Sequence, residues 1–240
     1  MMLGDDAMKR LAGCRVAVFG VGGVGGYAVE VLARSGVGAI VVIDNDDVAM
    51  SNVNRQIIAL TTNVGRKKVD VAEERIWAIN PECRVTKWPM FYLPANADSI
   101  DLTQYDYVID CIDTVAAKME LIRRCKRLEV PIICSMGMGY KFDATALRVA
   151  DITKTIMDPL AKMLRKRLRR EGINHFKCVY SPEKPVVITP TDDTQRVPAS
   201  NAWVPAAAGL ILGSEVIKDL INPPNPLTPY VPKCSKDFKN

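Results

Sequence analysis

Short apolar runs alternate with amphipathic stretches along most of the chain. Val16 to Phe19 and Ile40 to Ile43 are β-branched or aromatic runs that predict buried strands. Between them, Tyr27 to Ser35 carries apolar residues at helical spacing and is followed by Gly36, a residue type that often ends helices. The pattern therefore predicts a strand, a helix and a second strand in succession.

The same alternation continues to residue 134. Helices are predicted over residues 1–13, 64–79 and 114–128, and strands at Val85, Tyr105–Ile109 and Pro131–Cys134. Strands that alternate with helices favour a parallel sheet with crossover helices. We therefore expect an α/β fold, with a Rossmann-like, mostly parallel sheet and helices on both faces.

The pattern changes after residue 150. Asp158-Pro159 is a helix start, and Lys177–Ser181 and Val186–Thr189 are candidate late strands. A last helix is expected within residues 201–220, where Gly209 and Gly213 would allow close packing. We expect a nucleotide-binding portion at 1–150, a basic helix and substrate or dimer portion of the same domain at 151–222, and a proline-rich tail at 223–240.

Glycines follow the first predicted strand in the arrangement Gly20-x-Gly22-x-x-Gly25, with Gly23 inside it. Such a turn lets the backbone approach a phosphate at the start of the next helix. Asp44 ends the second strand, where an acid can bind ribose hydroxyls. The spacing predicts a nucleotide site but does not identify the nucleotide.

Composition excludes several classes of protein. The chain has 240 residues, 48% of them hydrophobic, and a formal charge of +5. Its seven cysteines form no C-x-x-C pair and it has one histidine, which argues against a disulfide framework or a structural zinc site. The longest apolar run, Trp203 to Leu212, is short of the roughly 20 residues that span a bilayer. We expect a cytoplasmic protein that does not enter the membrane.

Residues 162–170 concentrate positive charge, with six cations and no acid before Glu171. A solvated helix face and a contact with a polyanion explain this run equally well.

The loop after the second strand decides between nucleotide chemistries. It reads D-N-D-D-V-A-M-S-N-V-N-R-Q from Asp44 to Gln56, and Lys68 follows the turn at Gly65. Behind a G-x-G-G-x-G turn, this pattern resembles the ubiquitin-activating-enzyme-like superfamily of ThiF-type adenylating enzymes. An enzyme that cleaves a triphosphate at its α-phosphorus needs cations directed at the phosphates. A dehydrogenase, which transfers a hydride, needs a nicotinamide pocket instead.

The resemblance implies a role for each matching residue. Arg55, Lys68 and Asp113 would be catalytic, and Asp113 would also hold Mg²⁺. Asp44 would bind the ribose, with Gly23 against the nucleotide. The ATP-binding set that it implies is Gly20, Gly22, Gly23, Gly25, Asp44, Asp46, Ser51, Asn52, Arg55, Gln56, Lys68 and Thr114.

Within the superfamily, the segment from Asp151 to Arg170 resembles the tRNA threonylcarbamoyladenosine dehydratases, as do INPECRV at Ile79–Val85 and NRQI at Asn54–Ile57. The C-x-x-C pairs of the sulfur-carrier activators are absent, and Cys178 is a remote candidate for an acceptor thiol. The resemblance implies ATP-dependent cyclisation of the threonylcarbamoyl group on an adenosine next to the anticodon.

The same resemblance implies a homodimer that acts on tRNA carrying threonylcarbamoyladenosine. Its candidate tRNA-binding residues are Lys162, Arg165, Lys166, Arg169 and Arg170. In the superfamily an arginine from an N-terminal stretch reaches the partner's triphosphate; we expect this chain to start after that stretch, leaving Lys9 and Arg10 as the nearby cations.

Other functions stay open at this point. The chain could adenylate the C-terminus of a sulfur-carrier or ubiquitin-like protein, which would then be its partner. It could instead be a nucleotide- or tRNA-binding module without catalysis. A third hypothesis is that the glycine turn belongs to an NAD-dependent oxidoreductase.

Overall fold

The computed structural model describes residues 2–186 and 199–222. Within them one seven-stranded sheet has the order β3-β2-β1-β4-β5-β7-β6, and only the β6–β7 pair is antiparallel. The strands are β1 (Arg15–Phe19), β2 (Ala39–Ile43), β3 (Arg84–Trp88), β4 (Tyr107–Asp110), β5 (Ile132–Ser135), β6 (Arg148–Asp151) and β7 (Lys177–Tyr180). The predicted Rossmann-like α/β class is confirmed.

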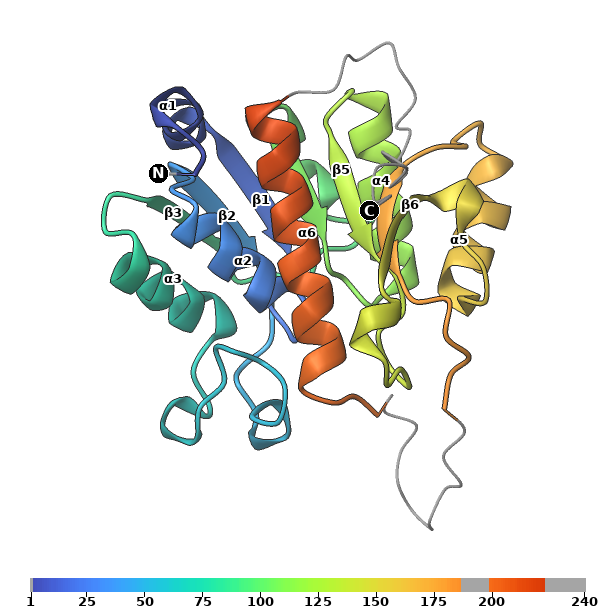
Figure 1. The fold of residues 1–240 in the computed structure, drawn as a ribbon, viewed down its shortest axis with the longest axis horizontal. Coiled ribbons are helices and arrows are strands. Elements are labelled where there is room, and N and C mark those ends of the chain that lie inside the picture. Colours follow the sequence, from blue (N-terminus) through green and yellow to red (C-terminus); the bar gives the residue numbers. More distant parts are fainter. Residues whose placement is uncertain (1, 187–198, 223–240) are drawn as a thin grey trace, which may run out of the picture.

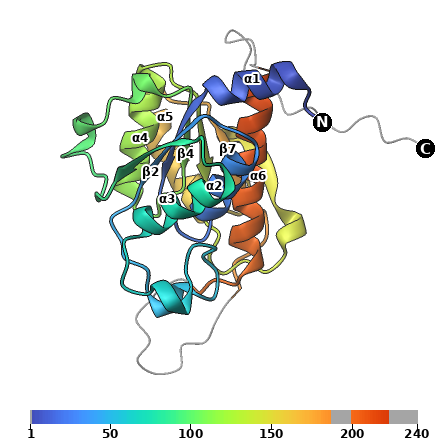
Figure 2. The same cartoon turned by 90° about the vertical axis from the view of Figure 1, so that its left-hand side faces the viewer.

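Helices cover both faces of this sheet, as the continuous burial of residues along β2, β4, β5 and β7 requires. The helices are α1 (Asp5–Gly13), α2 (Gly25–Arg34), α3 (Lys68–Ile79), α4 (Val115–Arg127), α5 (Pro159–Arg169) and α6 (Trp203–Ile221). Val16 and Val18 of β1 join the core under α1, α2, α3 and α6, whereas Ala17 and Phe19 join the core under α4 and α5. Figures 1 and 2 show these two layers on opposite sides of the sheet.

The strand order reverses direction between β1 and β4. β2 and β3 lie on one side of β1, while β4, β5 and β7 follow on the other. In open α/β sheets, ligands bind outside the carboxyl ends of the strands at this reversal. The fold thus places the ends of β1, β2 and β4 around one point.

The structure refines several predicted boundaries. The predicted helix over 64–79 begins at Lys68, and the strand predicted at 105–109 runs from Tyr107 to Asp110. Strand β6 has no counterpart among the predictions, because Arg148–Asp151 is short and half-exposed at the sheet edge. The predicted strand at 186–189 extends outside the described residues, and the predicted tail at 223–240 lies entirely outside them.

Helix α6 lies directly against α2, as two glycines predict. A Cβ on Gly209 would lie 2.2 Å from the Val24 carbonyl oxygen, and one on Gly213 would lie 2.6 Å from Cβ of Val31. The close packing predicted for Gly209 and Gly213 is confirmed. It holds the first turn of α6 beside the glycine turn that follows β1 (Figure 1).

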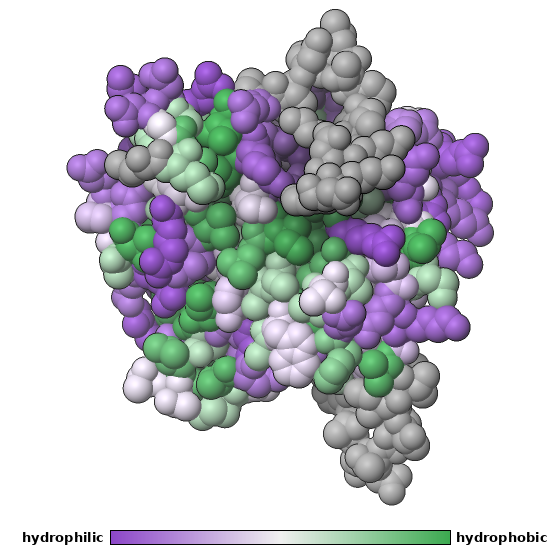
Figure 3. Space-filling model, viewed as in Figure 1, coloured by the Kyte–Doolittle hydropathy of each residue, from purple (hydrophilic) through white to green (hydrophobic). Residues whose placement is uncertain are grey.

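The surface differs in character from one helix to another. In Figure 3 hydrophobic residues gather over α6 in the middle of the view, and hydrophilic residues dominate the right-hand edge near α5. Leu210 of α6 is 46% exposed. No helix in residues 2–186 and 199–222 combines the length and the apolar character needed to cross a membrane.

Candidate nucleotide-binding and active site

A cavity of about 500 Å³ opens at the carboxyl ends of β1, β2, β4 and β5. One side is formed by the glycine turn, the loop after β2 and the start of α3, and the other by segments after β4 and β5. The residues lining it are Phe19, Gly20, Gly22, Gly23, Val24, Ile43, Asp44, Asn45, Asp46, Asn52, Arg55, Gln56, Lys68, Met90, Phe91, Tyr92, Cys111, Ile112, Asp113, Ser135, Met136, Gly137, Met138, Gly139, Leu160, Ser200 and Pro205.

The positions of the turn favour glycine for two different physical reasons. Gly20 has a φ of +87°, and a Cβ on Gly25 would lie 1.8 Å from the carbonyl oxygen of Gly20, so packing and backbone conformation require both. Gly22 and Gly23 line the cavity, as Gly20 does, but neither has a positive φ, and the nearest atom to a Cβ on Gly22 is Nε2 of Gln56 at 3.6 Å. These two positions leave room for a ligand beside the backbone.

Asp44 connects the end of β2 to the glycine turn. Its Oδ2 accepts a hydrogen bond from the Val21 amide at 2.7 Å, and its Oδ1 accepts one from the Asp46 amide at 2.9 Å. Burial raises the pKa of the Asp44 carboxyl above its ordinary value, although Lys68 and these amides oppose the shift. The carboxylate is therefore fixed in position, with lone pairs left to accept from ligand hydroxyls.

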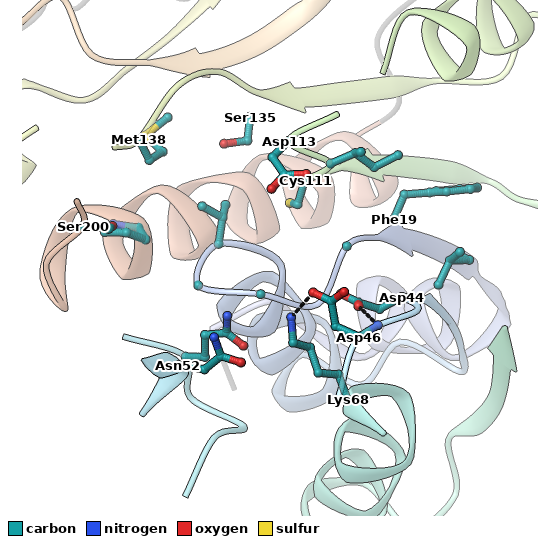
Figure 4. A pocket seen from close by; sticks show the side chains of 18 of the residues that line it. Phe19, Asp44, Asp46, Asn52, Lys68, Cys111, Asp113, Ser135, Met138 and Ser200 are labelled. Atoms are coloured by element: carbon teal, nitrogen blue, oxygen red, sulfur yellow. Dashed lines mark hydrogen bonds and ion pairs between the residues drawn. The ribbon is translucent and has the colours of Figure 1, made fainter. Parts of the chain in front are cut away.

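Lys68 brings a buried positive charge to the same wall. Lys68 is 4% exposed, and its ammonium group donates a hydrogen bond to Oδ2 of Asp46 at 2.6 Å (Figure 4). The neighbouring Lys67 points elsewhere, pairing with Asp47 at 2.8 Å on an exposed surface. Lys68, the lysine chosen by its spacing from Gly65, therefore lines the cavity, and Lys67 is not among the lining residues.

The loop after β2 presents Arg55 to the cavity without a carboxylate partner among the described residues. Its Nη1 donates to the Ser51 carbonyl oxygen at 2.7 Å and to Oδ1 of Asn54 at 2.8 Å. Asn52 holds the loop by accepting from the Ala49 amide at 3.0 Å. Gln56 is buried, and its Oε1 has no hydrogen-bond partner. The loop thus offers unused polar groups to a ligand.

Asp113 stands on the opposite side of the cavity, at the end of the segment that follows β4. Figure 4 shows it with Cys111, across the cavity from Asp44, Asp46 and Lys68. The Asp113 side chain is exposed, and Thr114 contacts it through Oγ1 at 3.4 Å. Burial raises the pKa of the Cys111 thiol well above its ordinary range, so Cys111 stays a neutral thiol.

A fully buried ion pair supports the Asp113 segment from beneath. Lys118 of α4 donates to Oδ2 of Asp110 at 2.6 Å and to the Ser135 carbonyl oxygen at 3.0 Å. Both charged side chains are 0% exposed, and Asp110 also accepts from the Ile112 amide at 3.1 Å. Burial lowers the pKa of Lys118 but the attraction of Asp110 outweighs it, so the net shift is upward. The pair ties together β4, α4 and β5 below the cavity.

Most of the predicted nucleotide residues line this one cavity, but three do not. Gly25 is enclosed by the turn, Ser51 contributes its backbone carbonyl to Arg55, and Thr114 touches Asp113 from outside the lining. The other members of the predicted set, from Gly20 to Asp113, face the cavity. Distant parts of the chain therefore converge as the sequence pattern indicated.

Sequence reasoning did not foresee the second half of the cavity. This half comes from Ser135 at the end of β5, from residues 136–139, and from Leu160 and Ser200. Residues 90–92, which follow β3, also line the cavity without having been predicted, but on the side of β2. The signal that could have found it is the position of Gly137-Met138-Gly139 directly after β5, because β5 is parallel to β4 and ends at the same edge.

The predicted tRNA-binding residues lie on α5, whose N-cap Asp158 accepts from the Ala161 amide at 2.8 Å. Lys162, Lys166, Arg169 and Arg170 are exposed. Arg165 is half-buried and donates to the carbonyl oxygens of Ile152 and Thr155, so it also fastens α5 to the preceding turn.

Arg10, one of the two cations predicted near the N-terminus, donates to the Ile221 carbonyl oxygen at 2.6 Å, at the C-terminal end of α6.

The sequence profile of the ThiF family matches residues 1–236. The chain belongs to the ThiF family. It is 43% identical over 234 residues to the tRNA threonylcarbamoyladenosine dehydratase of Bacillus subtilis, covering 92% of each chain. ThiF-type proteins are adenylating enzymes, and the predicted superfamily is thereby confirmed.

Two solved structures of the Escherichia coli tRNA threonylcarbamoyladenosine dehydratase, TcdA, share the fold. The complex with AMP has a TM-score of 0.84 at 40% identity, covering 92% of this chain and 91% of that one. The complex with ATP has a TM-score of 0.82 at 40% identity, covering 92% and 90%. These likenesses agree with a nucleotide cavity at the carboxyl edge of the sheet.

The arrangement suits chemistry on phosphates. Two cations, Arg55 and Lys68, share a wall with backbone amides of the glycine turn, and an exposed carboxylate faces them. Fixed positive groups can stabilise charge that develops on a phosphate, and the cavity exceeds the volume needed for phosphates alone.

Proposed function

We propose that this chain is an ATP-dependent tRNA threonylcarbamoyladenosine dehydratase. The observation that carries the proposal is the convergence of the glycine turn, Asp44, Arg55, Lys68 and Asp113 on one cavity. The chain is 43% identical to a protein of that name over 92% of both lengths, which supports the same assignment.

The first step is adenylation of the threonyl carboxylate. A carboxylate oxygen attacks the α-phosphorus of ATP, the bond to the β-phosphate oxygen breaks, and pyrophosphate leaves. Arg55 and Lys68 would stabilise the negative charge that grows on the triphosphate. Asp44 would bind the ribose, and Gly22 and Gly23 would let the nucleotide lie close to the backbone.

The second step closes a ring within the same molecule. The carbamoyl group next to the acyl adenylate attacks its carbonyl carbon, the bond from that carbon to the AMP oxygen breaks, and the carbamoyl group loses a proton to solvent. The nucleoside has then lost one oxygen, which leaves with AMP, and two protons in the net reaction, which amounts to one water. Because the acceptor is already tethered, the enzyme needs to supply position but no nucleophile of its own. The neutral thiol of Cys111 agrees with this expectation.

Asp113 would hold Mg²⁺ against the triphosphate, where the ion would spread the developing charge. Mg²⁺ is commonly held by one or two carboxylates together with nucleotide phosphates and water, and the exposed Asp113 fits this pattern. Among the described residues, no group of three or more His, Cys, Asp or Glu side chains is arranged to hold a metal.

The half of the cavity after β5 would receive the modified adenosine, and the exposed cations of α5 would contact tRNA phosphates. The division into a nucleotide portion at 1–150 and a substrate portion at 151–222 follows this assignment. We also propose a homodimer, for which the apolar surface over α6 in Figure 3 is a suitable interface.

The deciding experiment is mass spectrometry of nucleosides from tRNA bearing threonylcarbamoyladenosine after incubation with the protein, ATP and Mg²⁺. We expect a nucleoside lighter by one water, together with AMP. Unmodified tRNA and the variant Asp113→Ala serve as controls that should release no AMP. ATP–pyrophosphate exchange that responds only to a small protein with a Gly-Gly end would contradict the proposal.

A further inference from the structure

The cations of α5 do not stand alone, because α4 packs beside α5 in the same core and contributes its own. Two grooves lie between the helices, with volumes of about 450 and 530 Å³, and both include Arg123 and Glu171. We call them together the α4–α5 groove; its charged and polar lining is Arg123, Lys126, Arg127, Arg167, Arg170, Glu171, Asn174 and His175.

Most cations of this groove are available to a ligand. Lys126, Arg127, Arg167 and Arg170 are exposed, and none of them pairs with a carboxylate among the residues that the structure describes. Lys126 and Arg127 come from the last turn of α4. The cationic surface therefore draws on two helices, whereas the sequence indicated only α5.

Glu171 is the one acid that lines the groove within the described residues. Arg123 binds it in a bidentate pair, through Nε at 2.6 Å and Nη2 at 2.6 Å. The carboxylate thus occupies a guanidinium that a phosphate would otherwise bind in the same geometry.

The position of the groove relates it to the cavity. α5 begins at Pro159, next to Leu160 in the cavity wall, and α4 begins two residues after Asp113. With a rise of about 1.5 Å per residue, Arg123 and Arg167 lie roughly 10–15 Å along the helices from the cavity rim. A substrate whose reacting nucleotide enters the cavity would extend its flanking backbone over this surface.

We propose that the α4–α5 groove binds the phosphate backbone of the tRNA beside its reacting nucleotide, and that Glu171 weakens this contact by holding Arg123. The identification of the polyanion as tRNA rests on the proposed function. Unpaired arginines recognise phosphates irrespective of base sequence, which suits a site that positions RNA while the cavity selects the modified base.

The test measures the dissociation constant of an unmodified tRNA transcript over a salt series, without ATP, so that binding is separated from turnover. Each cation that contacts a phosphate should contribute about 1 to the slope of log affinity against log salt. Arg167→Ala/Arg170→Ala should lower the slope by about 2 and weaken binding about tenfold per lost contact near 0.1 M salt.

Glu171→Gln should have the opposite effect, with tighter binding and a steeper slope, because it removes a negative charge from the groove and breaks the bidentate ion pair with Arg123, whose other acid, Glu120, lies 3.6 Å away. The matched control is Glu74→Gln, since Glu74 forms an equivalent exposed pair with Arg66 through distances of 2.5 and 3.0 Å, near the opposite edge of the sheet. That control should bind tRNA like the unaltered protein.

Unchanged binding in the double arginine variant, or weaker binding in Glu171→Gln than in Glu74→Gln, would overturn the proposal. Failure of the proposed function is distinguishable, because the variants would then bind as expected while no dehydrated nucleoside forms. Equal melting temperatures for all variants and the unaltered protein establish that the altered surfaces leave the fold intact.

Discussion

The glycines of the turn differ in how tightly the fold encloses them. A Cβ on Gly25 would lie 1.8 Å from the Gly20 carbonyl oxygen, well inside van der Waals contact. A Cβ on Gly23 would lie 3.3 Å from Cβ of Pro205 and 3.5 Å from Cγ of Arg55. A side chain at position 25 would therefore require the backbone to move, whereas one at position 23 would require only a small shift of the Pro205 or Arg55 side chain.

Gly25→Ala and Gly23→Ala should therefore fail in different ways. We expect Gly25→Ala to lower the free energy of unfolding by about 3 kcal/mol or more, measured by urea denaturation, because backbone must move. Gly23→Ala should unfold like the unaltered protein while its KM for ATP rises about tenfold, equivalent to about 1.4 kcal/mol. An unchanged KM in Gly23→Ala would remove Gly23 from the nucleotide contacts.

The adjacent lysines Lys67 and Lys68 offer a second residue-scale comparison. Lys68 is buried beside the cavity, and Lys67 is exposed and paired with Asp47. Lys68→Ala should reduce ATP-dependent AMP release by about 10²-fold or more, because it removes charge stabilisation of the transition state. Lys67→Ala should stay within a few-fold of the unaltered protein. A larger loss in Lys67→Ala than in Lys68→Ala would mean that Lys67, not Lys68, acts on the phosphates.

The segment that carries Asp113 depends on the packing of α4 against β4. Asp110 and Lys118 are 0% exposed, and each would be left without its charged partner if the other were removed. Sequence alone could predict the strand, the helix and Asp113 between them. It could not predict the ion pair, because residues eight apart meet only through the packing of α4 on the sheet.

Lys118→Met should lower the free energy of unfolding by about 3–5 kcal/mol, since it leaves the Asp110 carboxylate buried and unpaired. The double variant Asp110→Asn/Lys118→Met should recover a substantial part of this loss, because the uncompensated charge is gone. Denaturant unfolding of both single variants and the double variant gives the coupling free energy. Additive effects would mean that the pair contributes no interaction of its own.

The other elements show the same division between local and tertiary information. The turn, α2 and β2 could be predicted because strand, glycines and helix carry distinct local patterns over consecutive residues. β6 could not, because Arg148–Asp151 becomes a strand only by antiparallel pairing with β7, at an edge where alternation is weak. The half of the cavity after β5 was missed for the related reason that its residues are uncharged and carry no charge pattern.

For the whole molecule, the cavity joins parts of the chain that are remote in sequence, from Phe19 to Pro205. A ligand that bridges them binds only the folded state, so its binding free energy adds to the stability of the entire fold. This coupling gives a measurement that depends on the nucleotide alone and requires neither tRNA nor turnover.

ATP with Mg²⁺ at about 100 times its dissociation constant should stabilise the protein by about 2.7 kcal/mol. For a domain of this size each kcal/mol shifts Tm by about 2–4 °C, so we expect a rise of about 5–10 °C in a thermal melt. Asp113→Ala should lose the part of this shift that depends on Mg²⁺ and keep the part that ATP gives alone, because Asp44 and the glycine turn remain. NAD at the same concentration should leave Tm unchanged, because under the proposed function Arg55 and Lys68 bind a triphosphate, which NAD lacks. A shift with NAD as large as that with ATP would instead favour the oxidoreductase reading of the glycine turn.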